Sequence, residues 1–447
     1  MIFRFGKISS HKPQAINIRG VFFMEQSTIA LIIIGVVIVM YITEIFSVAV
    51  TSIIGMLALV YANVLGFSDA FACFASTPAL LTIGMIIIAD AILESGVGNE
   101  IGVMLTKVVG HREKLFVVVV FLSAALFSAF ANNSAIVALY MPFIASIAVA
   151  SRGRITKKNT YLPLAMGSLV GGTGSLAGCT APLLANEVLE YMGVETMGFF
   201  TTAPIAIAMV LVIAVCFWLF FYDFMKKSFD FEEITDGGKK LPDGEIDRRK
   251  AIISITVFLV CIILFMIRPF GWDIGLIAVT GALVLVMTGC VDGKKAMRDM
   301  QWSAVLVLGA ALAMAKGFVS SGAGEVIINF LMKNFEKVVT NPVALVTIFL
   351  LTGFVLSQFM SNGSLVSMLA AIGIPLAMQI GCNPMPIALA CVYGCSLAMA
   401  TPVATTSITI VQVAGYRFKD YLRIGGLVGL IGAATAWVCL VFGYGLI

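Results

Sequence analysis

Charged residues are scarce in this chain of 447 residues: they make up 12% of it, whereas hydrophobic residues make up 60%. A soluble domain carries about 25% charged residues, and the mean hydropathy here is +1.05. Lipid must therefore be the solvent for most of the surface, and the composition predicts an all-α membrane protein with many spans. The net charge of +4 is spread over loops, and no basic segment with interleaved aromatics indicates a nucleic-acid partner.

Histidine is almost absent, and the nine cysteines form no CxxC pair. His11 and His111 lie in polar segments and most cysteines lie in apolar runs, so zinc and disulfide sites lack ligands and the cysteines are expected to serve packing. A membrane-embedded enzyme would need a nucleophile with a base, or a metal. Because we count only Asp90 and Glu94 as acids at membrane depth, we predict that the protein is not an enzyme.

Residues 115–150 form the most informative stretch, because two apolar runs meet there at Asn132, Asn133 and Ser134. A single helix of this length would rise about 54 Å, well beyond a ~30 Å hydrocarbon core. Basic residues flank both ends of the stretch. Both ends are thus expected on one face of the membrane, and the stretch is predicted to be a re-entrant helical hairpin with its polar tip inside the bilayer.

The other apolar runs fall into two sets of similar layout. The first-half runs lie at about 27–44, 46–66, 79–106, 115–150, 161–192 and 201–222. The second-half runs lie at about 251–268, 273–290, 303–332, 342–380, 385–415 and 424–446. We therefore divide the chain into an N-terminal tail (1–26), a first repeat (27–222), a polar linker (223–250) and a second repeat (251–447), with Met24 as an alternative start.

Matching residues in the two sets support a duplication. Gly55 and Gly281 are 226 positions apart, Asn133 and Asn362 are 229 apart, and Thr180 and Thr405 are 225 apart. Placing the linker in the cytoplasm puts most Lys and Arg residues on that side, as the positive-inside rule requires. The first hairpin then opens to the cytoplasm and the second to the exterior, so we predict repeats of inverted topology, about five spans each, in the cell (inner or plasma) membrane.

Polar residues recur at matched positions inside the apolar runs. They occupy the two hairpin tips, as Ser128, Asn132, Asn133 and Ser134 and as Ser357, Ser361, Asn362, Gly363 and Ser364. They also occupy two later stretches, 171–186 and 393–407, whose Gly, Pro and Thr residues should unwind a helix. Such clusters often serve close helix packing only. Their recurrence in both halves favours ion coordination instead, with unwound carbonyls for a cation and helix N-termini for an anion.

Asp90, Glu94 and Lys316 are charges within apolar runs. Such residues are functional candidates by default. They lie outside the tips, so an ion pair that stabilises a scaffold or a subunit interface is the favoured interpretation. Lys316 as a built-in replacement for a coupling ion is the alternative.

At these tips the sequence resembles the divalent anion/sodium symporter family, the dicarboxylate, citrate and sulfate carriers of the ion transporter superfamily. That family has a Ser-Asn-Thr motif at each of two oppositely oriented hairpin tips and Thr-Pro-Pro-Asn-like breaks in two later helices. Here the tips read Asn132-Asn133-Ser134 and Ser361-Asn362-Gly363. The breaks contain Thr180-Ala181-Pro182-Leu183 and Thr405-Thr406-Ser407-Ile408.

The resemblance implies a homodimeric elevator-type transporter in which the hairpins and broken helices carry substrate with Na⁺ past a scaffold. By position, one Na⁺ would be held by Ser128, Asn132, Asn133 and backbone near Cys179, and another by Ser357, Ser361, Asn362 and backbone near Ala404. The residues implied to line the anion site are Asn133, Ser134, Thr180, Asn362, Gly363 and Thr405.

Three positions depart from the family pattern. Gly363 lacks the hydroxyl that the family directs at a substrate carboxylate, and Leu183 and Ile408 replace the Asn of each break. We expect a secondary active transporter of a small anion, a di- or tricarboxylate first of all, driven by Na⁺ symport. An arsenite- or proton-linked carrier or exchanger of the same superfamily is the alternative, and a channel is less favoured because occluded tips give no continuous pore.

Overall fold

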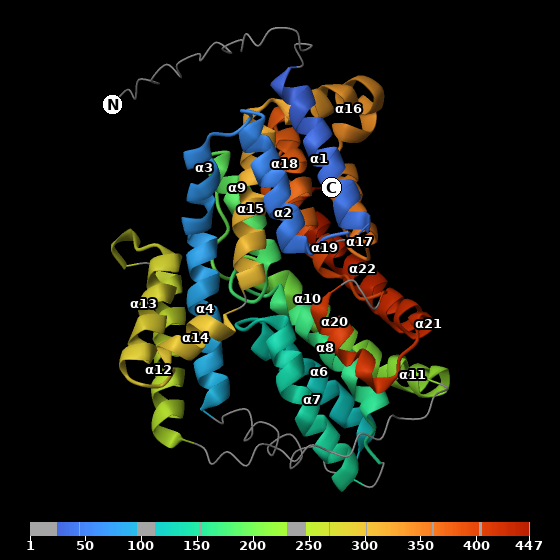
Figure 1. Cartoon of the computed structure of the whole chain (residues 1–447). Helices are drawn as coiled ribbons and strands as arrows, with labels where there is room; N and C mark the ends of the chain where they lie inside the picture. The colour runs from blue at the N-terminus through green and yellow to red at the C-terminus, as the bar shows by residue number, and fades with distance from the viewer. Residues whose placement is uncertain are drawn as a thin grey trace.

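A computed structural model describes residues 25–43, 45–95, 112–151, 154–229, 247–267, 269–300, 302–359, 362–401 and 405–446. These residues are helical throughout, with no strand among them (Figure 1). Five of the helices are long and apolar enough to cross a membrane. The protein is therefore a multi-pass membrane protein, as its composition predicts.

A π-helical turn, Phe217–Phe221, joins the last two helices of the first half. In chain order the helices of this half are α1 (Gln26–Thr43), α2 (Val48–Tyr61), α3 (Phe67–Ala72), α4 (Thr77–Glu94), α6 (Glu113–Ser128), α7 (Asn133–Ala150), α8 (Lys157–Gly172), α9 (Thr180–Tyr191), α10 (Ala203–Cys216) and α11 (Tyr222–Ser228).

The second half begins with the same order of two long helices, a short one and a long one, and ends differently, with two short helices before a long one. Its helices are α12 (Arg248–Ile267), α13 (Ile274–Met287), α14 (Gly293–Asp299), α15 (Trp302–Ser320), α16 (Ala323–Val339), α17 (Pro342–Leu356), α18 (Asn362–Gln379), α19 (Met385–Ser396), α20 (Thr406–Ile410), α21 (Phe418–Asp420) and α22 (Gly426–Gly443). A second π-helical turn, Tyr421–Gly425, joins α21 to α22.

The spans expected from the sequence are mostly found, with two exceptions. The prediction that the run 303–332 is one span is wrong, because Gly322, at φ +74°, lies between the end of α15 and the start of α16. Glycine adopts this left-handed conformation without strain. The short helices α3 and α14 were not expected. The end of the run 79–106 lies outside the described residues beyond Ser95.

Tight helix contacts recur at matched positions in the two halves. A β-carbon on Gly55 of α2 would lie 2.4 Å from Met314 of α15, and one on Gly281 of α13 would lie 3.2 Å from Ile88 of α4. Met314 and Ile88 are themselves 226 positions apart. Each half therefore packs its second long helix against a helix of the other half, and glycine at the contact lets the two helices approach closely.

Close contacts at glycine also hold each hairpin against a neighbouring helix. Glycines on α8 and α19 rest against carbonyl groups on the first arm of each hairpin: a β-carbon on Gly167 would lie 2.4 Å from the oxygen of Phe121, and one on Gly394 would lie 2.4 Å from that of Leu350. In Figure 1 the first hairpin, α6 and α7, lies at the lower end of the view, while α17 and α18 lie in its upper part.

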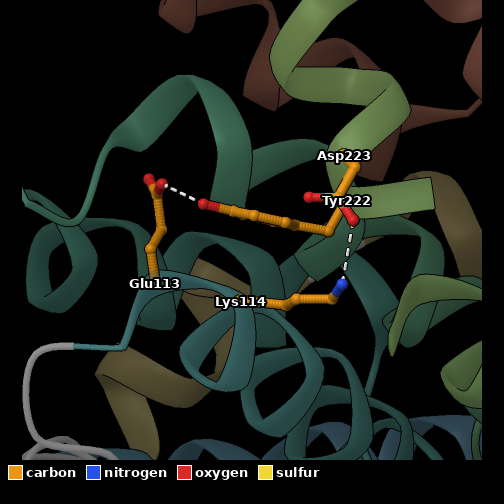
Figure 2. A network of polar contacts seen from close by, with 4 residues as sticks. All are labelled: Glu113, Lys114, Tyr222 and Asp223. Atoms are coloured by element: carbon orange, nitrogen blue, oxygen red, sulfur yellow. Dashed lines mark hydrogen bonds and ion pairs between the residues drawn. The ribbon is translucent and has the colours of Figure 1, made fainter. Parts of the chain in front are cut away.

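The base of the first hairpin is fixed by the carboxylate of Glu113, at the start of α6. It accepts hydrogen bonds from Thr156 N (2.8 Å), the Thr156 hydroxyl, Asn159 Nδ2 (3.1 Å) and the Tyr222 hydroxyl (2.7 Å). Figure 2 shows Glu113 facing Tyr222, beside the ion pair of Lys114 with Asp223. One carboxylate thus joins α6, α8 and α11.

Replacing Glu113 with alanine is expected to destabilise the protein by about 2–4 kcal/mol, because several partly buried donors lose a charged acceptor. Lys114→Ala is the matched control. It removes an ion pair whose side chains are 31% and 59% exposed, and such pairs contribute less than about 1 kcal/mol. Thermal unfolding in detergent measures both. Equal losses in the two variants would contradict the role given to Glu113.

Candidate functional site

The first hairpin tip begins where α6 ends at Ser128 and α7 starts at Asn133. Asn132 is the N-cap of α7, and its side-chain Oδ1 accepts from Ser134 N at 3.0 Å. Asparagine suits this position because its amide oxygen satisfies one of the free N–H groups of the first turn. The tip therefore presents the N-terminus of an 18-residue helix, with its positive dipole end.

The Asn133 amide reaches into the break between α8 and α9. Its outer atom lies 2.6 Å from Ser128 Oγ, 3.2 Å from the Ser168 carbonyl oxygen and 3.3 Å from the Gly178 carbonyl oxygen. A β-carbon on Gly172 would lie 2.1 Å from the same amide, so glycine is required there. With Nδ2 outermost, Asn133 donates to both carbonyls; with Oδ1 outermost, three oxygens converge and only a cation would hold them together.

The second tip has the same layout but leaves a polar atom without a partner. Asn362 begins α18, and its Oδ1 is buried without a hydrogen bond to any residue that the structure describes. Ser357 is fully buried and its hydroxyl donates to Phe354 O at 3.1 Å. Buried acceptors without donors are uncommon and mark places where a ligand is expected. Ser361 lies outside the described residues.

Each tip faces the broken helix of the other half. Ser134 Oγ of α7 lies 3.3 Å from Ser407 Oγ of α20. In the other direction, a β-carbon on Gly363 of α18 would lie 3.4 Å from Thr180 Oγ1 and 3.2 Å from Leu184 of α9. The two tips and the two breaks therefore meet, and residues more than 170 positions apart line one region.

The predicted residues thus fall into two groups that lie at the tips. At the first tip Ser128 bonds to Asn133, and Cys179 is the N-cap of α9 in extended conformation. At the second, Gly363 lies beside Thr180. Thr405 caps α20, with its hydroxyl accepting from Ile408 N at 3.4 Å. The predicted backbone ligand Ala404 lies outside the described residues.

Sequence reasoning missed Gln358, which follows Ser357 and is 6% exposed. Its amide spans from the hairpin to the second break: Nε2 donates to Phe354 O (2.8 Å) and Leu397 O (3.2 Å), and Oε1 accepts from Ala400 N (2.8 Å). The Thr401 hydroxyl donates to the Gln358 carbonyl at 2.6 Å. A buried polar residue directly after a tip serine was the available signal.

The charges predicted within apolar runs have the following neighbours in the structure. Glu94 pairs with Lys295 of α14 at 2.6 Å, through side chains that are 39% and 44% exposed. Lys316 lies over the Tyr191 ring, 5.8 Å from its centroid. A third acid was overlooked: Glu187 of α9 is only 8% exposed. Asp420 is buried as well, at 1% exposed, so the protein interior holds acids that the sequence analysis did not single out.

A model of the citrate transporter family matches residues 38–394. The chain belongs to the citrate transporter family. This confirms the resemblance to divalent anion/sodium symporters that the two hairpin tips indicated. Members and relatives of the citrate transporter family are transporters, so the chain is grouped with transport proteins and not with enzymes.

Curated relatives of this citrate transporter family member are distant. The sodium-dependent dicarboxylate transporter SdcS of Staphylococcus saprophyticus is 24% identical over 440 residues, which cover 90% of this chain and 83% of the relative. The uncharacterized transporter YfbS of Escherichia coli is 26% identical over 187 residues, 42% of this chain and 30% of the relative. The chain thus spans about a third of that longer protein.

Solved structures show the fold of this citrate transporter family member in other transporters. The YdaH transporter of Alcanivorax borkumensis superposes with a TM-score of 0.63 at 13% identity, over 94% of this chain and 99% of that one. MtrF of Neisseria gonorrhoeae, described as an antimetabolite efflux pump, gives 0.56 at 15% identity over 94% and 96%. At such identities the likeness concerns the fold alone.

Proposed function

We propose that this protein is a secondary active transporter that carries a small anion, a di- or tricarboxylate first of all, by Na⁺ symport. One observation carries the proposal: the two hairpin tips meet the two helix breaks, through Ser134 with Ser407 and through Gly363 with Thr180. This brings helix N-termini and irregular backbone together within a membrane protein, which is the arrangement that anion and cation sites of secondary transporters use.

The anion would lie between the tips. The N-termini of α7, α9 and α18 supply free N–H groups and positive dipole ends there. Hydroxyl and amide groups supply further hydrogen bonds, and the unpartnered Oδ1 of Asn362 is available to a substrate hydroxyl or protonated carboxyl. We assign the substrate to Asn133, Ser134, Thr180, Asn362, Gly363 and Thr405.

The Na⁺ ion would lie at the first tip. Hard cations hold oxygens at about 2.4 Å, so neighbouring ligands stand about 3.4 Å apart. Asn133 Oδ1, turned outermost, stands 3.2–3.3 Å from the carbonyl oxygens of Ser168 and Gly178. Ser128 and Asn132, with backbone at Cys179, complete this set. The equivalent set in the second half is Ser357, Ser361, Asn362 and backbone near Ala404.

The same proposal includes the way in which substrate crosses. The matched contacts of the two halves, with α6 and α7 lower in Figure 1 than α17 and α18, support repeats of inverted topology over 27–222 and 251–447 with a cytoplasmic linker between them. We infer an elevator in which α6–α9 and α17–α20 move past a scaffold that includes α2, α4, α13 and α15. A homodimer would hold two such scaffolds still.

The test is uptake of labelled succinate, citrate and sulfate by proteoliposomes. Replacing external Na⁺ with K⁺ at constant membrane potential is expected to lower uptake of the preferred anion at least about tenfold, because a symported ion supplies the driving force. Equal uptake in the two salts would favour the proton- or arsenite-linked alternative. Absence of uptake of every probe would contradict the assigned substrate class.

A further inference from the structure

Gln358 makes the second tip chemically unlike the first. The residue stands four positions before Asn362, just as Ala129 stands four before Asn133. Its amide is 6% exposed and holds hairpin and break together through Phe354, Leu397 and Ala400. A methyl group at the equivalent place in the first tip makes no such bonds. The Gln358 amide is thus fixed between the hairpin and the break of the second half, at a position where the first half has a methyl group.

The amide nitrogen of Gln358 lies among three oxygen atoms. Nε2 lies 2.8 Å from Phe354 O, 3.2 Å from Leu397 O and 3.4 Å from Ser357 Oγ. Carbonyl and hydroxyl oxygens gathered at a helix end and a helix break are ligands that a hard cation prefers. Here the positive ends of two N–H bonds satisfy them instead.

The Gln358 amide cannot flip to exchange the positions of its oxygen and nitrogen, whereas the Asn133 amide can. Gln358 Oε1 accepts from Ala400 N at 2.8 Å, so a flip would place an NH₂ group against an N–H and an oxygen against two carbonyl oxygens. Three hydrogen bonds would be exchanged for three repulsive contacts. The Asn133 amide has no such second anchor in the described residues, so it is free to present either atom to the carbonyls.

We propose that Gln358 takes the place of a cation at the second tip, so that each transport cycle uses a single Na⁺, bound at the first tip. The inference rests on the proposed Na⁺ symport and specifies its stoichiometry. Ser357 is then a hydrogen-bonding partner of Gln358, and Asn362, which Gln358 does not engage, serves the substrate alone. The second tip stays joined to its break whether or not Na⁺ is present.

Gln358→Glu tests this with an isosteric change. The substitution replaces the donor by an oxygen among Phe354 O, Leu397 O and Ser357 Oγ and keeps the acceptor for Ala400 N, which completes an all-oxygen site. Radioactive Na⁺ binding to the purified full chain is expected to rise from one ion per protomer to two. In proteoliposomes the Hill coefficient for Na⁺ should rise from about 1 towards 2. Gln412→Glu, at an exposed position, is the control and should leave one ion.

Two Na⁺ ions per wild-type protomer would overturn the proposal, as would a Gln358→Glu protein that is folded and still binds one. If that variant fails to fold, the wild-type count and a Gln358→Ala variant, which frees the same oxygens, decide instead. Failure of the symport itself is recognised separately: the wild type then binds no Na⁺ and its uptake ignores Na⁺. A site gained in Gln358→Glu would still establish the role of the amide in that case.

Discussion

Replacing Asn133 with alanine is expected to reduce uptake of the preferred anion by about two orders of magnitude while the protein remains folded. The change removes the side-chain group that joins the tip to the break, and it removes a proposed Na⁺ ligand and a substrate contact together. Losing hydrogen bonds worth about 3 kcal/mol in total corresponds to roughly a hundredfold loss. Proteoliposome uptake under a Na⁺ gradient measures the change, and Na⁺ binding should disappear with it.

Asn341→Ala is the matched control for this prediction. Asn341 caps α17 at the outer end of the second hairpin, where Oδ1 accepts from Val343 N and Ala344 N. Its loss should cost about 1 kcal/mol of stability and leave uptake intact. Near-normal uptake by the Asn133→Ala protein, measured beside this control, would reduce the first tip to a packing feature.

Replacing Gly425 with alanine should prevent folding or destabilise the protein by at least about 3 kcal/mol, the range of severe overpacking. A β-carbon there would lie 1.8 Å from the Met399 carbonyl oxygen and 2.6 Å from its carbon. Both atoms belong to the backbone of the second break, which has little freedom to yield. The yield of monodisperse protein in detergent and its unfolding temperature measure the effect.

The neighbouring glycine supplies a stringent control. Gly426 has nearly the same helical dihedral angles, φ −61° and ψ −46° against φ −62° and ψ −40°. Its β-carbon would meet nothing nearer than Ala400 at 3.9 Å. Gly426→Ala should therefore stabilise the helix by up to about 1 kcal/mol. If both variants behave alike, the close approach of α22 to the break does not exist.

The helix ends at the first tip and the break after Gly172 could be predicted from the sequence, because they depend on residues near one another in the chain. Asn132 and Asn133 between two apolar runs identify a hairpin, and glycines with threonine in 171–186 identify a break. The similar spacing of matched residues, such as Gly55 and Gly281, indicates two matched halves. None of these inferences needs a contact between distant segments.

The features that the sequence did not predict depend on contacts between distant segments. The spacing of 229 positions shows that Asn362 corresponds to Asn133, but it does not reveal which break each tip faces. Gln358 looked like an ordinary polar residue until Leu397 and Ala400, about 40 positions away, were found to surround its amide. Glu187 was overlooked because it stands near the end of an apolar run, where exposure was the natural expectation.

The exchanged contacts of the tips have a consequence for the ancestry of the chain. Ser134 meets Ser407, and Gly363 meets Thr180, so every such contact takes one member from each copy. On the proposed duplication, a gene encoding one copy would have supplied one partner of each of these two contacts, whereas Asn133 with Gly178 and Gln358 with Leu397 would have met within one copy. On the same proposal, two separate polypeptides would have had to associate before fusion to form the exchanged contacts, and Gln358 and Ala129 would be positions at which the copies later diverged.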